Sequence, residues 1–132
     1  MSLGSVIASA SAMLFAAGAS SLILDHRERW GDGTIVIFRR VPLPVRRKPA
    51  VPTRAPDRVE VVPTARLWAS QSTVTEHGVD AYLRGVPGPL PVVFAESDGT
   101  YTIVDGHHRI VAALLRGAQA IRARVVTVPV GA

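Results

Sequence analysis

Residues 88–128 change hydrophobic period twice, and this pattern restricts the fold more than any other feature of the sequence. Two apolar, β-branched runs at 90–95 and 100–104 flank a Ser-Asp-Gly turn signal, which is typical of a β-hairpin. Apolar residues with helical spacing follow and stop at Gly117, a residue type that often ends helices. Alternating apolar residues from Ile121 onward predict a last strand. The order is strand, turn, strand, helix, strand, so we predict an α/β (α+β) fold with a small mixed sheet and helices.

Weaker signals upstream add elements to this unit. Thr73 and Glu76 have the spacing of a helix capping box, and the helix predicted after them ends at Gly85, before a proline-rich stretch. β-branched and aromatic residues predict a strand at 34–38, and residues 59–62 are expected to form an edge strand.

Prolines divide the chain into two parts. Six of the ten prolines lie between residues 41 and 63, and proline cannot donate the backbone hydrogen bond that helices and sheets need. We therefore predict an extended linker here and place the compact domain at 58–132. Residues 1–57 are expected to hold an apolar helix, a short strand and the basic, proline-rich linker.

Residues 3–24 carry no charge, and the stretch is long enough for a membrane span. Serine, glycine and alanine dilute its hydrophobicity, and no Lys or Arg precedes it as one would in a signal peptide. Helical spacing of its apolar residues also fits a helix that packs on the domain or on a partner protein. Three interpretations stay open: a packed or interface helix, a membrane anchor and a cleaved signal. The expected location is cytoplasmic, with membrane anchoring as the alternative.

Positive charge is concentrated in one segment. The chain has a formal net charge of +5, but residues 39–58 alone hold seven basic residues against Asp57, the single acid. Such a segment can contact nucleic-acid phosphates, or it can be a solvated linker. The chain has no cysteine, which excludes disulfides, thiolate metal sites and a cysteine nucleophile. The candidate nucleic-acid-binding residues are Arg39, Arg40, Arg46, Arg47, Lys48 and Arg54.

An anion-binding site is predicted where the second hairpin strand runs directly into the helix, at Val104-Asp105-Gly106-His107-His108-Arg109. A helix start presents unpaired N–H groups and the positive end of the helix dipole. Gly106 would let a ligand approach the backbone, and Arg109, one turn into the helix, could grip a phosphate. His107 and His108 would add donors or a base.

The same residues also allow purely structural roles. Asp105 could cap the helix, the histidines could be exposed, and Arg109 could pair with an acid. A metal site formed by Asp105, His107 and His108 is not expected, because adjacent side chains on a helix diverge by about 100°.

The run Tyr101–Ala113, with Gly117 and the strand at 121–126, resembles the ParB/sulfiredoxin superfamily. Domains of that superfamily carry a strand, a Gly-x-x-Arg turn, a helix with Ala-Ala, a glycine and a further strand. The resemblance is specific over 88–128, weaker back to about residue 58, and absent before it. In ParB-type proteins this turn binds the phosphates of a nucleotide, typically CTP. The resemblance therefore implies a nucleoside triphosphate (CTP or ATP), with Mg²⁺ as a further candidate, held by Gly106, His107, His108 and Arg109.

Departures from the superfamily limit what the resemblance implies. A cysteine performs the chemistry of sulfiredoxins, but His107 stands in its place, so we expect no sulfiredoxin activity. ParB-type partition proteins also carry a helix-turn-helix domain, for which we expect no room here. Free-serine kinases of this fold use a carboxylate base, for which Asp105 or Glu76 can be nominated. The candidate catalytic residues are Asp105 and His108.

We therefore expect a nucleotide-binding, ParB-like domain that acts on or near DNA. NTPase or nuclease activity is compatible with this expectation, and whether the protein is an enzyme stays open. Lone domains of this type occur in bacterial phage and mobile elements. Two alternatives come from other functional classes. One is a small-molecule phosphotransferase of the serine-kinase type, and the other is a non-enzymatic adaptor that contacts a membrane or a partner protein through residues 3–24.

Overall fold

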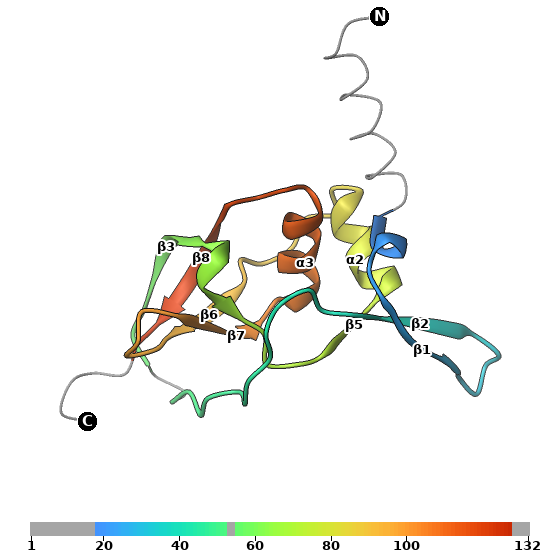
Figure 1. Cartoon of the computed structure of the whole chain (residues 1–132), viewed down its shortest axis with the longest axis horizontal. Helices are drawn as coiled ribbons and strands as arrows, with labels where there is room; N and C mark the ends of the chain where they lie inside the picture. The colour runs from blue at the N-terminus through green and yellow to red at the C-terminus, as the bar shows by residue number, and fades with distance from the viewer. Residues whose placement is uncertain (1–17, 53–54, 128–132) are drawn as a thin grey trace, which may run out of the picture.

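The computed structural model describes residues 18–52 and 55–127, which form an α+β fold (Figure 1). The described part contains two α-helices and two β-sheets, one of three strands and one of five. The fold class predicted from the sequence is confirmed.

The strand–turn–strand–helix–strand unit is present as predicted. β6 (Val92–Ala95) and β7 (Tyr101–Asp105) form the antiparallel hairpin, α3 (His107–Leu115) follows directly, and β8 (Ala120–Val126) returns parallel to β6. The helix ends at Leu115, and Gly117, which follows the cap residue Arg116, has a φ of +80°, a backbone conformation that glycine adopts without strain. This unit forms the centre of the molecule in Figure 1.

Five strands make the larger sheet, in the order β3-β8-β6-β7-β4. β3 (Asp57–Pro63) is the predicted edge strand and pairs antiparallel with β8. At the opposite edge, β4 (Leu67–Trp68) follows the 3-10 turn η2 (Thr64–Arg66) and pairs parallel with β7. Alternation along β8 buries Ala123 and Val125 and turns the arginines beside them to the other face, as predicted.

Three strands make the smaller sheet, in the order β1-β2-β5. β1 (Leu24–Arg29) and β2 (Ile35–Arg40) form a hairpin that projects from the rest of the molecule, and β5 (Thr73–Thr75) leads into α2 (Glu76–Leu83) (Figure 1). The strand predicted at 34–38 corresponds to β2. β1 was not predicted, because its charged residues lack an apolar alternation and all of them are exposed. Pairing with β2 is what orders it.

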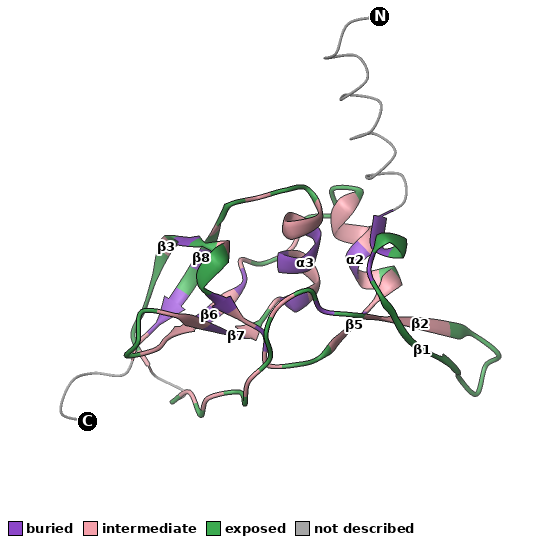
Figure 2. Ribbon diagram, in the orientation of Figure 1, coloured by how far each residue is buried: buried purple, intermediate pink, exposed green. Residues whose placement is uncertain are grey.

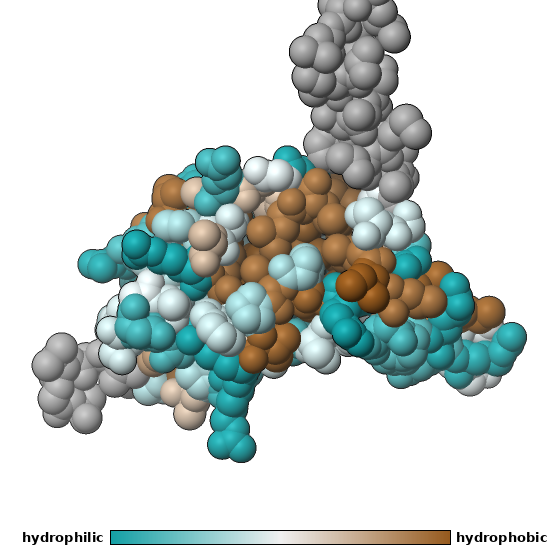
Figure 3. Space-filling model, viewed as in Figure 1, coloured by the Kyte–Doolittle hydropathy of each residue, from teal (hydrophilic) through white to brown (hydrophobic). Residues whose placement is uncertain are grey.

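α3 contributes buried residues, which Figure 2 colours purple, to two hydrophobic clusters. Its Ile110 packs with Val93 and Val125 of the five-stranded sheet. Val111 and Ala112 instead face a second cluster, which holds Val79 of α2 together with Ala19, Leu22 and Val41. Figure 3 shows apolar side chains at the surface around α3, between two hydrophilic flanks.

The last residues of the apolar segment 3–24 do not form the helix that was predicted for this segment. Residues 18–21 form a 3-10 turn, η1 (Gly18–Ser21), and Leu24 already belongs to β1, so a helix through residue 24 is wrong. The Asp80 carboxylate holds η1 by accepting a hydrogen bond from the Ala19 N–H at 3.1 Å. Residues 1–17 lie outside the described part, and their interpretation stays a prediction. Within the described residues, no helix has the length and hydrophobicity that crossing a membrane requires.

The predicted capping box is wrong by two residues. Thr75, not Thr73, caps α2, because its Oγ1 accepts from the Gly78 N–H at 3.2 Å. Thr73 pairs with β2 as part of β5, and the Glu76 carboxylate binds Arg39 at 2.9 Å instead of the helix start. Tertiary pairing therefore decides which of two nearby threonines becomes the cap.

Residues 41–46 of the predicted linker pack against the domain. Val41 is buried, and its N–H donates to the Ser72 carbonyl at 2.9 Å. The Pro44 carbonyl accepts from Ala69 at 2.8 Å, and Arg46 donates back to the Ala69 carbonyl at 2.9 Å. Buried contacts thus cross the boundary that we placed between residues 57 and 58, and that division of the chain stays a prediction.

Candidate functional site

The junction between β7 and α3 has the geometry that the sequence predicts, with Gly106 as the single connecting residue. Gly106 has a φ of +94°, which side chains other than glycine rarely tolerate. A Cβ at this position would lie 2.9 Å from the Cα of Pro91, so the backbone of the 88–91 loop passes directly over the turn. Both requirements select glycine.

The start of α3 is not capped by a side chain, unlike the start of α2. The predicted alternative in which Asp105 caps the helix is therefore wrong. The first intrahelical bond joins the Ile110 N–H to the Gly106 carbonyl at 3.0 Å. Among the described residues, the N–H groups of His107, His108 and Arg109 have no acceptor. Three aligned donors and the positive end of the helix dipole are left at this point.

His107 is buried, with 4% of its surface exposed. Its Nε2 accepts a hydrogen bond from the Ser70 N–H at 3.0 Å, and the Ser70 hydroxyl donates to the Ile103 carbonyl at 2.6 Å. Burial, assisted by His108 and Lys48 and opposed by Asp105, lowers the pKa of His107 from 6.5 to about 4. The ring is therefore neutral, with its proton on Nδ1.

His108 makes the corresponding contact on the other side of the helix start. Its Nε2 accepts from the Thr75 N–H at 3.0 Å, and burial lowers its pKa. The ring fits against Gly78, where a Cβ would lie 2.5 Å from the His108 Cδ2. Both histidines thus join α3 to residues 70–75. Because both Nε2 atoms already accept hydrogen bonds, each neutral ring can offer a ligand only its Nδ1–H donor, and neither ring nitrogen is free to act as a base in this arrangement.

Arg109 lies beside the junction and holds the 88–91 loop in place. Its Nη1 donates to the carbonyls of Gly88 and Pro89, the second at 2.6 Å. The alternative in which Arg109 pairs with an acid is not what the structure shows. Nε and Nη2 have no acceptor within the described residues, so the guanidinium keeps donors for a ligand.

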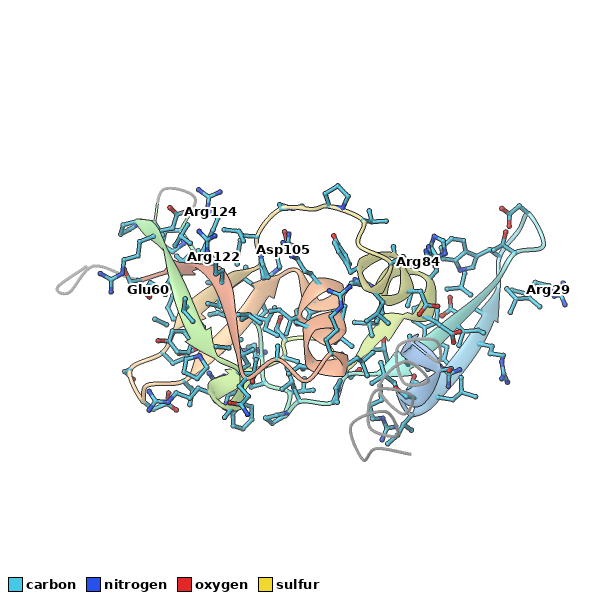
Figure 4. The ribbon with its side chains drawn as sticks, turned by 90° about the horizontal axis from the view of Figure 1, so that it is seen from above. Arg29, Glu60, Arg84, Asp105, Arg122 and Arg124 are labelled. Atoms are coloured by element: carbon cyan, nitrogen blue, oxygen red, sulfur yellow. The ribbon has the colours of Figure 1, made fainter. Side chains whose placement is uncertain are left out.

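Asp105 is exposed and lines a hollow together with Pro89, Leu90, Val92 and Arg124. Three residues of β3 line the same hollow: Asp57, Arg58 and Val59. Val92 pairs with both Asp105 and Arg124, so these residues form one row across three strands. Figure 4 shows Asp105, Arg122 and Arg124 near one another, whereas Arg29 lies at the opposite end of the molecule. The hollow therefore adjoins the helix start and carries both signs of charge.

The six predicted nucleic-acid-binding residues separate into different environments. Arg39 pairs with Glu76, and Arg40 pairs with Asp25 at 3.5 Å. Arg47 and Lys48 are exposed, and Arg54 lies outside the described residues. Lys48 is close enough to His107 to affect its pKa, because Arg46 and Val45 bind residue Ala69, next to Ser70. The structure thus brings the middle of the basic segment, at residues 45–48, close to the start of α3.

Several groups of the protein bind the guanidinium of Arg46, which is only partly exposed. Its Nε and Nη2 donate to the hydroxyls of Thr102 at 2.6 Å and Thr100 at 2.7 Å. The guanidinium also lies 4.8 Å from the centroid of a Trp68 ring and 4.0 Å from the Glu96 carboxylate. These contacts stabilise the fold, and they occupy the guanidinium that was predicted to bind nucleic acid.

Arg46→Ala is expected to lower the free energy of unfolding by about 2 kcal/mol, because it removes two hydrogen bonds and a cation–π contact. Arg47→Ala is the matched control, since Arg47 is exposed and the loss should stay below about 0.5 kcal/mol. Urea denaturation of both variants measures the difference. Equal stabilities of the two variants would contradict the structural role of Arg46.

Sequence reasoning missed the partners that surround the predicted turn. Ser70 and Thr75 bind the two histidines through their backbone, and the carbonyls of Gly88 and Pro89 bind Arg109. Backbone partners leave no trace in residue type. The Pro-Gly-Pro run at 87–89 was a turn signal, but it did not indicate which side chain the turn would meet.

No cluster of three or more His, Asp or Glu residues that could hold a metal ion is found within the described residues. No protein-family model matches the chain, and no curated protein matches it either. The resemblance to the ParB/sulfiredoxin superfamily therefore stays a prediction.

Proposed function

We propose that the start of α3 binds the phosphate groups of a nucleoside triphosphate, with CTP and ATP as the first candidates. The observation that carries the proposal is the set of three unpaired N–H groups at residues 107–109, which directly follow Gly106 and are not capped by any side chain. Aligned backbone donors at a helix start suit a phosphate, because they supply hydrogen bonds and a favourable dipole together.

Two cations strengthen this site for an anion. Lys48 is exposed and affects His107 electrostatically, and Arg109 keeps Nε and Nη2 for a ligand. Bidentate guanidinium contacts and a mobile ammonium group are common complements to a backbone phosphate site. The buried, neutral histidines would contribute shape and Nδ1–H donors.

The hollow beside the helix start suits the rest of a nucleotide. Leu90 and Val92 offer apolar surface there, and Asp105 and Arg124 offer polar groups for a sugar or base. Mg²⁺ would arrive with the triphosphate, and Asp105 is the carboxylate nearest to the site that could share it. If turnover occurs, Asp105 is the stronger candidate for a base, because the Nε2 of His108 already accepts from Thr75. DNA contact through Arg47 and Lys48 remains a separate prediction.

Lys48→Ala and Arg109→Ala are each expected to weaken binding of CTP or ATP about tenfold, since a hydrogen bond to a charged group contributes about 1.5 kcal/mol. Isothermal titration calorimetry in the presence of magnesium measures the dissociation constants. Arg29→Ala is the matched control, because it removes the same charge as Arg109→Ala at the far end of the molecule (Figure 4).

Lys48→Ala also separates binding from folding, because no described protein group bonds to this side chain, whereas Arg109→Ala loosens the 88–91 loop. Thermal unfolding of each variant is therefore recorded alongside the titration. Absence of binding to any nucleoside triphosphate, or equal affinities for the Lys48→Ala and Arg29→Ala variants, would overturn the proposal.

A further inference from the structure

The outer side of β3 is an open sheet edge. β3 is the terminal strand of the five-stranded sheet, and no described residue pairs with its free side (Figure 1). All seven of its residues pair with β8 in one continuous register without a bulge. Regular, exposed edges are templates for another strand, and proteins usually interrupt them with bulges or lysines.

Two hydrogen bonds at the ends of the ladder show which groups face outward. The Thr64 N–H donates to the Gln119 carbonyl at 3.0 Å, and the Thr127 N–H donates to the Pro56 carbonyl at 3.3 Å. Antiparallel ladders alternate, so the even-numbered residues of this stretch bond to β8. The N–H and C=O groups of Asp57, Val59 and Val61 therefore face away from the sheet. Pro63 occupies the next outward position, where the missing N–H costs no ladder bond.

We propose that β3 pairs antiparallel with β3 of a second copy of this chain, about a twofold axis at Val59. The outward groups of Val59 then bond to those of the partner's Val59, and Asp57 bonds to the partner's Val61 in the same way. Six backbone hydrogen bonds form, and the two five-stranded sheets join into one sheet of ten strands. The partner is thus a second copy of this chain, because the outward groups of β3 are complementary to those of an identical, antiparallel β3.

Charge complementarity selects this register and this partner. Arg58 comes to lie opposite the partner's Glu60 at a non-hydrogen-bonded position, where facing side chains are closest. By symmetry the contact occurs twice. Shifting the register by two residues in one direction would place Glu60 opposite the partner's Glu60, and in the other direction Arg58 opposite the partner's Arg58. Both shifts set like charges against each other.

Apolar surface on β3 supports the same arrangement. Val59 is 49% exposed and Val61 is 67% exposed, which is high for valine in a sheet. Across the twofold axis the two Val59 side chains meet, and each Val61 packs diagonally beside them. Arg58 and Glu60 already bond to each other at 2.8 Å, and Figure 4 places Glu60 at the outer margin of the molecule. Both charges are therefore positioned at the edge that the second copy would meet.

Charge reversal tests the register directly in the full chain by sedimentation equilibrium. Arg58→Glu and Glu60→Arg each replace two attractive contacts with two repulsive ones, so each single variant should weaken the dimer at least about tenfold. The double variant Arg58→Glu/Glu60→Arg restores opposite charges and leaves the net charge unchanged, and its dissociation constant should return close to that of the native chain.

Cross-linking provides a second, independent measurement, because the chain contains no cysteine. In the proposed register the two Val59 Cα atoms lie about 5.5 Å apart, within the range of a disulfide. Val59→Cys should therefore form a disulfide-linked dimer on mild oxidation. Val61→Cys, although more exposed, faces Asp57 of the partner and should cross-link far less. A monomeric native chain, single variants that dimerise like the native chain, or equal cross-linking at the two positions would overturn the proposal.

Discussion

Gly106→Ala is expected to lower the free energy of unfolding by about 3 kcal/mol, one of the two largest effects that the structure predicts. A left-handed backbone costs about 1–2 kcal/mol for alanine, and overpacking adds about 1–3 kcal/mol. Both apply here, because φ is +94° and the new Cβ would lie 2.9 Å from the Pro91 backbone. Urea denaturation monitored by circular dichroism measures the loss.

Gly117→Ala separates the two causes. Gly117 has a similar φ of +80°, but a Cβ there would meet no atom within 4 Å. Only the backbone cost then applies, so the expected loss is about 1 kcal/mol. If both variants lose the same stability, the close passage of the 88–91 loop over Gly106 is wrong.

Acidification from pH 6.5 to pH 4 is expected to remove about 3 kcal/mol of stability through His107, since each pKa unit corresponds to about 1.4 kcal/mol. The pKa of His107 is about 4 in the folded protein, and the ordinary value of 6.5 applies to the unfolded chain. Between these values the unfolded chain binds a proton that the folded protein does not bind. Stability is therefore complete above pH 6.5 and falls as the pH approaches 4. His108 acts in the same direction, because burial also lowers its pKa.

His107→Gln should flatten this part of the pH profile. Glutamine has an oxygen that can accept from the Ser70 N–H, and it does not titrate. His26→Gln is the control, because His26 is in the exposed hairpin and its pKa is raised by Asp25 and Glu28, so its removal should not flatten the acid loss. Denaturation midpoints measured from pH 7 to pH 4 give the three profiles. A His107→Gln profile parallel to that of the native chain would contradict a neutral, buried His107.

The local pattern predicted most of the sheet that carries the site. The hairpin, α3 and β8 follow from apolar periodicity and from glycine at positions 99, 106 and 117. The edge position of β3 followed from its flanking prolines. These features depend on interactions between residues close together in the chain, so short stretches of sequence are enough to predict them.

Long-range contacts explain what the sequence did not predict. β1 has no apolar alternation, and only pairing with β2 makes it a strand. The predicted linker contributes Val41 to the core, because the prolines beside it still allow backbone bonds to residues 69 and 72. Thr75 displaced Thr73 as the cap of α2, since β5 pairs with β2 up to that residue.

The candidate site divides in the same way. The sequence alone determined that a strand meets a helix at Gly106, because steric limits on φ and the start of helical periodicity are properties of adjacent residues. Only the tertiary structure decided what the polar side chains after it do. His107, His108 and Arg109 find their partners 20 to 37 residues away, on backbone groups that carry no residue-specific signature. Burial by those segments then sets the charge of the histidines, and no local pattern could have predicted it.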